Sequence, residues 1–118
     1  MARLSAHFDT SEFVCRHCGR LPASGIDPKL VALLERLRAG DDRPLPIVSG
    51  YRCPTHNRNV GGTPHSLHLI GRAADIPSGR FTVAQAVAAG AGGVGYCGRW
   101  VVHVDTRRVH RAVIFGDC

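Results

Sequence analysis

Two short segments contain more side chains capable of binding a metal than packing requires. SLHLIGRAAD at residues 66–75 contains His68 and Asp75, and VVHVD at residues 101–105 contains His103. A catalytic zinc takes three protein ligands, which can be histidines and a carboxylate, and keeps one position for water. A glycine between His68 and Asp75 can turn the chain so that both side chains face one point. Seven histidines also produce accidental pairs, so spacing alone makes these residues candidates.

The clearest element that could position these candidates is a predicted helix at residues 28–38. Asp27 precedes it as the N-cap residue, and Pro28 takes the first helical position. Apolar side chains recur along one face at Leu30, Val31, Leu34 and Leu37. We expect this stripe to pack into the core. Similar signals predict a helical turn at residues 9–13 and at residues 54–60, and a helix capped by Thr82 that runs to residue 89.

Short segments of apolar and β-branched residues predict the strands. They lie at residues 45–49, 73–76, 100–105 and 113–115. Residues 61–66 are predicted to form a loop, and the glycines of residues 90–95 a tight connection between elements. Helices and short strands in one chain indicate an α+β fold.

Length and composition limit the chain to one compact domain, residues 1–118. The chain is 44% hydrophobic, which is enough to bury a core, and it is too short for two domains. It contains no stretch that approaches the roughly 20 apolar residues of a membrane span. Its first residues include no apolar segment typical of a secretory signal, so we expect no export signal and no membrane partner.

The chain is strongly basic, with a formal net charge of +6, and all but Lys29 of its 15 basic residues are arginine. Such a surface attracts polyanions. The arginines form no dense run and no aromatic-rich motif accompanies them, so a nucleic-acid partner is not expected. Anionic cell-wall polymers fit the charge equally well, and a GC-rich genome would also favour arginine over lysine.

The five cysteines cannot all pair within the chain, because their number is odd. At least one thiol stays free or pairs between chains. Cys15 and Cys18 form a CxxC motif, which is half of a common structural zinc site. The second CxxC of such a site is absent, so buried thiols or a local disulfide are favoured over a second zinc.

Four segments together resemble the zinc D-Ala-D-Ala carboxypeptidase family, which includes phage endolysin peptidases and vancomycin-resistance dipeptidases. They are SGYRCPTHN (49–57), VGGTPHSLH (60–68), GRAADI (71–76) and VHVD (102–105). The similarity runs in order from about residue 7 to residue 107. It implies a small α+β domain with helices packed against an antiparallel sheet that carries the metal. It also implies one zinc per chain, bound by His68, Asp75 and His103.

The same resemblance implies roles for other residues. Arg52 would bind a substrate oxygen and stabilise the oxyanion, for which a permanently charged guanidinium is suited. Ser66 would orient the substrate or support the metal site. Relatives commonly carry an acid shortly before the third ligand, but residues 97–102 contain none. Asp105 is the nearest replacement as general base, because on a strand it shares a face with His103; alternatively it supports the site or pairs with an arginine.

The resemblance therefore predicts a zinc peptidase that hydrolyses peptidoglycan stem peptides, at the terminal D-Ala-D-Ala bond or at an internal bond. A basic domain without an export signal fits a phage-encoded lysin or a virion component that acts on the cell wall. The alternative is a non-catalytic zinc-binding structural or cell-wall-binding module on the same fold, comparable with the hedgehog signalling domain. A nucleic-acid binder is a third, more distant possibility, and steep salt dependence would be its signature.

Overall fold

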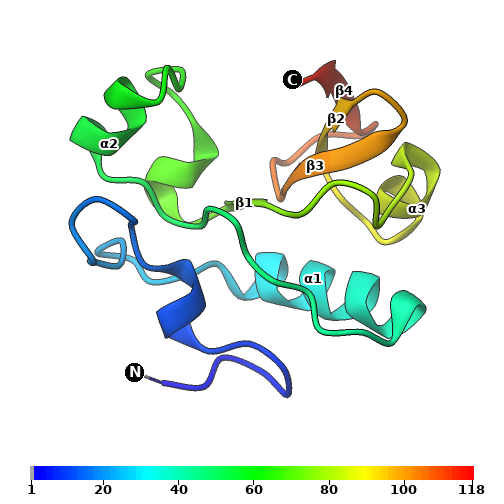
Figure 1. The fold of residues 1–118 in the computed structure, drawn as a ribbon, viewed down its shortest axis with the longest axis horizontal. Coiled ribbons are helices and arrows are strands. Elements are labelled where there is room, and N and C mark those ends of the chain that lie inside the picture. Colours follow the sequence, from blue (N-terminus) through cyan, green and yellow to red (C-terminus); the bar gives the residue numbers. More distant parts are fainter. Residues whose placement is uncertain (1) are drawn as a thin grey trace.

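The computed structural model contains one four-stranded sheet with helices packed around it, and it describes residues 2–118 (Figure 1). Met1, the first residue of the predicted domain, lies outside the described residues. The elements in chain order are η1 (Thr10–Phe13), α1 (Pro28–Asp41), α2 (Pro54–Asn59), η2 (Leu67–Ile70), β1 (Ala73–Asp75), α3 (Val83–Ala88), β2 (Gly93–Cys97), β3 (Trp100–Asp105) and β4 (Val113–Gly116). Here η denotes a 3-10 helix. The predicted α+β single domain is confirmed.

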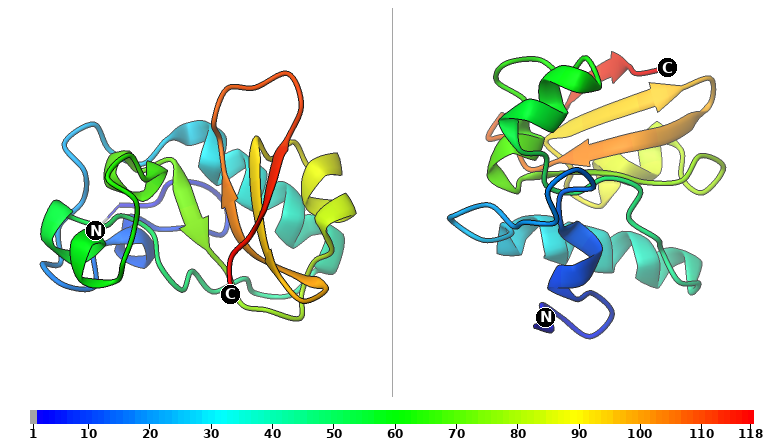
Figure 2. Two further views of the ribbon diagram at one scale, coloured as in Figure 1. Left: turned by 90° about the horizontal axis from the view of Figure 1, so that it is seen from above. Right: turned by 60° about the vertical axis from the view of Figure 1, so that its left-hand side comes forward.

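The sheet is mixed, so the prediction of a purely antiparallel sheet is wrong. Its strand order is β1-β3-β2-β4, in which β3 pairs antiparallel with both β1 and β2, whereas β2 pairs parallel with β4. The chain reverses direction after β3 but skips over β2, and β4 then adds to the outer edge of the sheet (Figure 2). A strand that is reversed relative to β3 must be parallel to β2, which is why the pair of β2 and β4 differs from the other two pairs.

The hydrophobic core lies between α1, α3 and one face of the sheet. The predicted stripe of α1 is buried, and Leu33 joins it. Val94 of β2 and Val104 of β3 belong to the same core cluster, together with Ala86 of α3. In the left view of Figure 2, α3 lies on one side of the strands, and α2 with the loop that follows it lies on the other. A site on the sheet face opposite α3 would therefore lie between the strands and this loop.

The N-cap signals identified the helices well. Asp27 caps α1 and accepts a hydrogen bond from the Lys29 N–H, and Pro28 is the first helical residue. Thr82 caps α3 through a reciprocal pair of hydrogen bonds with Gln85. Both helices begin where the sequence predicts, because the caps satisfy backbone N–H groups that the helix itself leaves free.

The predicted strand at residues 45–49 is absent from the described chain, which shows an isolated bridge from Ser49 to Asp75 instead. Pro44 and Pro46 cannot donate backbone hydrogen bonds, and the Arg16 guanidinium binds the carbonyl of Ile47. Leu45 and Ile47 are buried as expected, whereas Val48 is exposed. Pairing of this segment is limited to the backbone hydrogen bonds of Val48 and Ser49 with Asp75.

The glycine-rich segment, predicted to be a connection, forms β2 from Gly93 onward. A Cβ atom on Gly93 would lie 2.2 Å from the Asp105 carboxylate, and one on Gly95 would lie 2.9 Å from both His103 Cβ and the Phe115 ring. The glycines therefore make room on the sheet face for side chains of the neighbouring strands. Glycine is generally depleted in strands, so the local pattern predicted a connection where the structure forms a strand.

One disulfide joins Cys97, at the end of β2, to Cys118, two residues after β4. It connects the last strand to the sheet at the point where β4 ends. Cys15, Cys18 and Cys53 are free, so the odd cysteine count is accounted for within the described chain. No helix in residues 2–118 combines the length and the apolar character needed to cross a membrane.

Candidate metal centre

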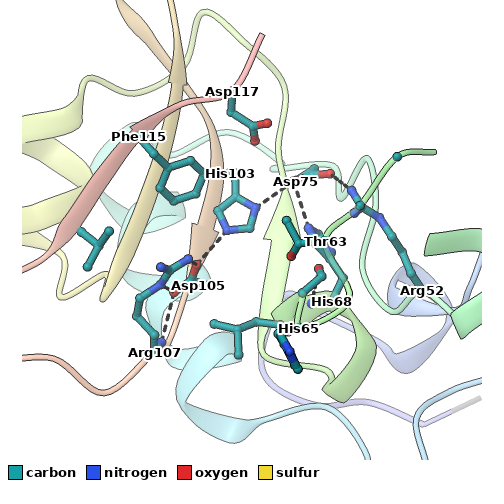
Figure 3. A pocket seen from close by; sticks show the side chains of 15 residues that line it. Arg52, Thr63, His65, His68, Asp75, His103, Asp105, Arg107, Phe115 and Asp117 are labelled. Atoms are coloured by element: carbon teal, nitrogen blue, oxygen red, sulfur yellow. Dashed lines mark hydrogen bonds and ion pairs between the residues drawn. The ribbon is translucent and has the colours of Figure 1, made fainter. Parts of the chain in front are cut away.

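His68, Asp75 and His103 converge on the open face of the sheet, as the sequence predicts. Asp75 Oδ1 lies 3.2 Å from His68 Nε2 and 3.1 Å from His103 Nδ1. All three donor atoms lie within 4.8 Å of one another. Figure 3 shows the two imidazoles on either side of the Asp75 carboxylate. Three convergent donors of these types are the ligand set of a catalytic zinc site.

The short helix η2 presents His68. Ser66 is its N-cap residue, and the Ser66 hydroxyl accepts a hydrogen bond of 3.2 Å from the His68 N–H. Gly71 ends the helix with φ at +71°, and a Cβ there would lie 2.7 Å from the Gly25 carbonyl oxygen. The close approach and the left-handed backbone both require glycine at this position. Through this hydrogen bond Ser66 holds the backbone of a candidate ligand, an arrangement that fits the supporting role, one of the two roles predicted for it.

Strand pairing brings Asp75 and His103 together, because the two residues lie directly opposite each other in the antiparallel pair β1–β3. A bulge in β3 directs the His103 side chain. Gly95 pairs with His103 and Tyr96 pairs with Val101, so Val102 is the additional residue on β3. The bulge shifts the alternation of side chains, so Val101 faces the core while His103 faces the site.

The outer nitrogen of each histidine has its own partner. His68 Nδ1 lies 2.7 Å from the Gly50 carbonyl oxygen, to which it can donate. His103 Nε2 lies 2.8 Å from Asp105 Oδ2. Such acceptors fix the orientation of a metal-binding imidazole and leave the other nitrogen free to face the metal. The residues present therefore fit a zinc ion at this centre.

Two opposing effects set the pKa values of these groups: burial disfavours the charged form of each side chain, and neighbouring groups of opposite charge favour it. Burial raises the pKa of the Asp75 carboxyl, but hydrogen bonds and charges from His103 and His68 hold it well below its usual range. Burial likewise raises the pKa of Asp105, and His103 and Arg107 lower it by more. Burial lowers the pKa of His103, but Asp105 and Asp75 raise it to about 9. The two carboxylates thus favour a positive charge at this centre.

Arg52 lies beside the predicted metal. Its Nη2 atom is 2.8 Å from Asp75 Oδ2, and the side chain is largely buried. Asp75 therefore uses one carboxylate oxygen toward the histidines and the other toward Arg52. The Arg52 N–H donates to the His68 carbonyl at 3.1 Å, which ties the backbone of the SGYR segment to η2. The guanidinium is in a position to contact a substrate oxygen close to the metal.

A pocket of about 660 Å³ opens over this centre. The sheet supplies one wall through His103 and Phe115, with Asp117 directly after β4, and the loop between α2 and η2 supplies the opposite wall. The pocket volume is within the usual range for small-molecule sites. A peptide segment can therefore reach the three donor atoms from the open side.

Asp105, the predicted general base, lies behind His103 and is completely buried. Its carboxylate contacts His103 Nε2, and it accepts three hydrogen bonds from Arg107, through the backbone N–H at 3.1 Å and the guanidinium at 2.9 and 2.7 Å. Both oxygens are occupied, and His103 separates them from the other two donors (Figure 3). This arrangement favours the supporting role, with Arg107 as the paired arginine.

Sequence reasoning missed Asp117. It lies directly after β4, is exposed, and lines the pocket near His103 (Figure 3). Its backbone N–H donates to the Tyr96 carbonyl at 2.8 Å, and the neighbouring Cys118 is linked to Cys97. The parallel pairing of β4 and this disulfide together hold an acid over the site. Neither feature is visible in the local pattern.

We expect Asp105→Asn to weaken zinc binding by about 10- to 100-fold, as is typical when the partner of a metal-binding histidine is changed. The amide keeps the shape but loses the charge that holds His103. Competition with a zinc chelator measures the affinity, and Asp41→Asn, which changes an ion-paired aspartate outside the pocket, is the control. Activity restored by excess zinc supports the positioning role. Activity that stays low at full zinc occupancy would assign Asp105 to the reaction itself.

Comparisons with known proteins agree with this geometry. A family model described as Peptidase M15 matches residues 6–105, which include all three ligands, Arg52 and Ser66. A zinc D-Ala-D-Ala carboxypeptidase from Streptomyces albus G is 45% identical over 38 residues. That segment is 32% of this chain and 15% of the relative, so most of the relative has no counterpart in the match. The relative's name and the donor types of this centre both indicate zinc as the metal. The chain belongs to the peptidase M15 family of zinc metallopeptidases.

Proposed function

We propose that the protein hydrolyses a peptide bond in peptidoglycan stem peptides, and that the bond it cleaves is primarily the terminal D-Ala-D-Ala bond. The observation that carries this proposal is the open pocket over three zinc-binding donors with Arg52 beside them. The name of the Streptomyces relative supports the choice of bond. The net charge of +6 supports action at an anionic cell wall, as a phage-encoded lysin or a virion component.

The residues around the pocket divide the work of the reaction. When bound, zinc supplies Lewis-acid polarisation of a carbonyl and lowers the pKa of a water molecule. Arg52 donates to the oxygen on which negative charge develops, and its hydrogen bond to Asp75 holds it ready for that contact. Asp105 keeps His103 in one orientation. These groups are fixed before substrate arrives, which reduces the reorganisation that the reaction requires.

Asp117 is our proposed general base. It is the exposed acid in the pocket, whereas Asp75 is committed to the histidines and Asp105 is buried behind His103. An exposed carboxylate can accept a proton from the attacking water and pass it to the leaving amine. Residues 6–105 of the family match stop short of Asp117, so its role rests on the geometry of this chain.

Two synthetic peptides test the bond specificity. One ends in D-Ala-D-Ala, and the other has the same stem but an amide in place of the terminal carboxylate. We expect mass spectrometry to show release of one D-Ala from the first peptide and a much slower reaction with the second. Cleavage of both peptides at an internal bond would replace the carboxypeptidase proposal with an endopeptidase. No cleavage of either by the zinc-loaded protein would favour the non-catalytic cell-wall-binding module.

We expect Arg52→Lys to lower turnover by about 10- to 1,000-fold, as the loss of one oxyanion donor does. Lysine keeps the positive charge but loses the planar fork that reaches both Asp75 and a substrate oxygen. Turnover and zinc content are measured together, because the variant is expected to keep its zinc. Arg58→Lys, an exposed change in α2, is the matched control. Unchanged kinetics in Arg52→Lys would remove Arg52 from the reaction.

A further inference from the structure

Three cysteines form a second cluster of metal-binding side chains. Cys15, Cys18 and Cys53 are free thiols, and their sulfur atoms lie within 4.8 Å of one another. Cys15 and Cys18 follow η1, whereas Cys53, which is 38 residues after Cys15, is the N-cap residue of α2. The fold therefore supplies a third thiol to the CxxC motif from a distant part of the chain.

A tight turn holds the two cysteines of the motif. The Cys15 N–H donates to the Arg20 carbonyl at 2.9 Å, and the Gly19 N–H donates to the Cys15 carbonyl at 2.8 Å. Gly19 adopts a φ of +69°, which other residues rarely adopt, and this lets the turn close directly after Cys18. Cys15 is buried and Cys18 exposed, so the cluster lies at the surface with one thiol anchored in the interior.

Backbone N–H groups are directed at two of the sulfur atoms. The Cys53 N–H lies 3.4 Å from Cys15 Sγ, and the His56 N–H lies 3.4 Å from Cys53 Sγ. Donors of this kind stabilise a sulfur atom that carries negative charge. The thiolate is the form of cysteine that binds metals, so the backbone is arranged in favour of metal binding.

We propose that Cys15, Cys18 and Cys53 bind a structural zinc ion, separate from the centre formed by His68, Asp75 and His103. Each thiol releases its proton when the metal binds. Structural zinc sites are tetrahedral, and three cysteines with one histidine are a standard ligand set. A disulfide would use two of the three clustered sulfur atoms and leave the third without a role, whereas a zinc ion uses all three.

Two histidines lie close to these cysteines in the sequence and are the candidates for a fourth ligand. His17 lies between Cys15 and Cys18 in the sequence, and His56 lies three residues after Cys53 in α2. Their rings are stacked, with centroids 6.1 Å apart and planes inclined by 6°. Loss of zinc in His17→Ala or in His56→Ala identifies which imidazole takes part, and retention in both assigns the fourth position to water.

The cluster lies beside the segment that contributes Arg52 to the pocket. Cys53 directly follows Arg52, and the nearby Gly50 carbonyl accepts from His68. The same segment is joined to η1 by a hydrogen bond of 2.9 Å from the Tyr51 N–H to the Phe13 carbonyl. A zinc ion would bind both sides of this contact, and so hold the segment that presents Arg52 and orients His68.

Metal counting and cobalt substitution separate the two sites. We expect native mass spectrometry to find two zinc ions per wild-type chain, one in Cys53→Ser and one in His103→Ala. After replacement by cobalt, the wild type and His103→Ala should show thiolate-to-cobalt charge-transfer absorption, which Cys53→Ser should lack. The centre of His68, Asp75 and His103 contains no sulfur and cannot produce that absorption.

Alkylation of the wild-type protein tests the proposal without any variant, and it decides the question if Cys53→Ser does not fold. In the zinc-loaded protein, Cys15, Cys18 and Cys53 should resist alkylation, including the exposed Cys18, and a chelator should make all three reactive. Three results would each overturn the proposal: a zinc content that is the same in the wild type and Cys53→Ser, rapid alkylation of Cys18 in the zinc-loaded protein, or a disulfide among these cysteines in peptides prepared without reduction.

Discussion

Replacing His103 by alanine is expected to remove the zinc at the sheet and to lower turnover by about 1,000-fold or more. His103 supplies one of three donor atoms and is the link between Asp75 and the buried Asp105. Zinc contributes several kcal/mol of stabilisation to the transition state, and each 1.36 kcal/mol is worth about tenfold in rate. His68→Ala should have the same effect, because His68 supplies a second donor. Metal analysis and peptide hydrolysis measure the two consequences separately.

His7→Ala is the matched control for these variants. His7 also pairs with a carboxylate, Glu35, at 2.7 Å, but it lies outside the pocket. It should keep both zinc and activity. The zinc proposed at the cysteine cluster should remain in all three variants. His68→Ala and His103→Ala should therefore each lose one zinc ion per chain, and His7→Ala none. If His68→Ala and His103→Ala both kept the zinc content of the wild type, the ligand assignment would be wrong.

Asp117→Asn is expected to lower turnover by about 100- to 10,000-fold while zinc stays bound, because the amide cannot accept the proton. Within residues 2–118, Asp117 makes no hydrogen bond to His68 or His103, so its loss should leave the metal affinity unchanged. Measurements of turnover at saturating zinc, with the zinc content of the same samples, give both quantities.

The response to excess zinc distinguishes Asp117→Asn from Asp105→Asn. If Asp117 is the base and Asp105 supports His103, excess zinc restores Asp105→Asn and leaves Asp117→Asn inactive. The reverse pattern would return the role of base to Asp105, as the sequence first predicted. Asp41→Asn again serves as the control, since Asp41 pairs with Arg43 and Arg80 outside the pocket.

The candidate metal ligands were predictable because they depend on residue types within short motifs. His68 and Asp75 are close in the sequence, with Gly71 providing the turn between them. The contact of Asp75 with His103 was not predictable from any local pattern. It depends on the register of β1 against β3 and on the bulge at Val102, both of which are set by pairing between distant segments.

The errors in the fold have the same origin. Leu45 and Ile47 are buried, but Pro46 cannot donate a backbone hydrogen bond and the Arg16 side chain occupies the Ile47 carbonyl, so a ladder does not form there. Glycine at 93 indicates a turn when read alone, yet it makes room for the carboxylate of Asp105 on the next strand. In each case a contact with a distant residue outweighs the local preference.

Two functional features depended entirely on the three-dimensional arrangement. Asp117 reaches the pocket because β4 adds parallel to β2, and Cys53 completes the cysteine cluster because α2 begins beside the turn that follows η1. The sequence shows a CxxC motif without a second pair, and the fold shows a single cysteine in its place. Both features join segments whose contact the sequence pattern does not reveal.

Digestion of purified peptidoglycan in water enriched in oxygen-18 tests the central claim most directly. The account predicts that zinc-loaded wild-type protein releases products with one heavy oxygen in each new carboxylate, because hydrolysis adds one oxygen from water to that group. A chelator should stop the release, added zinc should restore it, and His103→Ala should release nothing. Intact peptidoglycan after incubation with wild-type protein that binds its full complement of zinc would contradict the account.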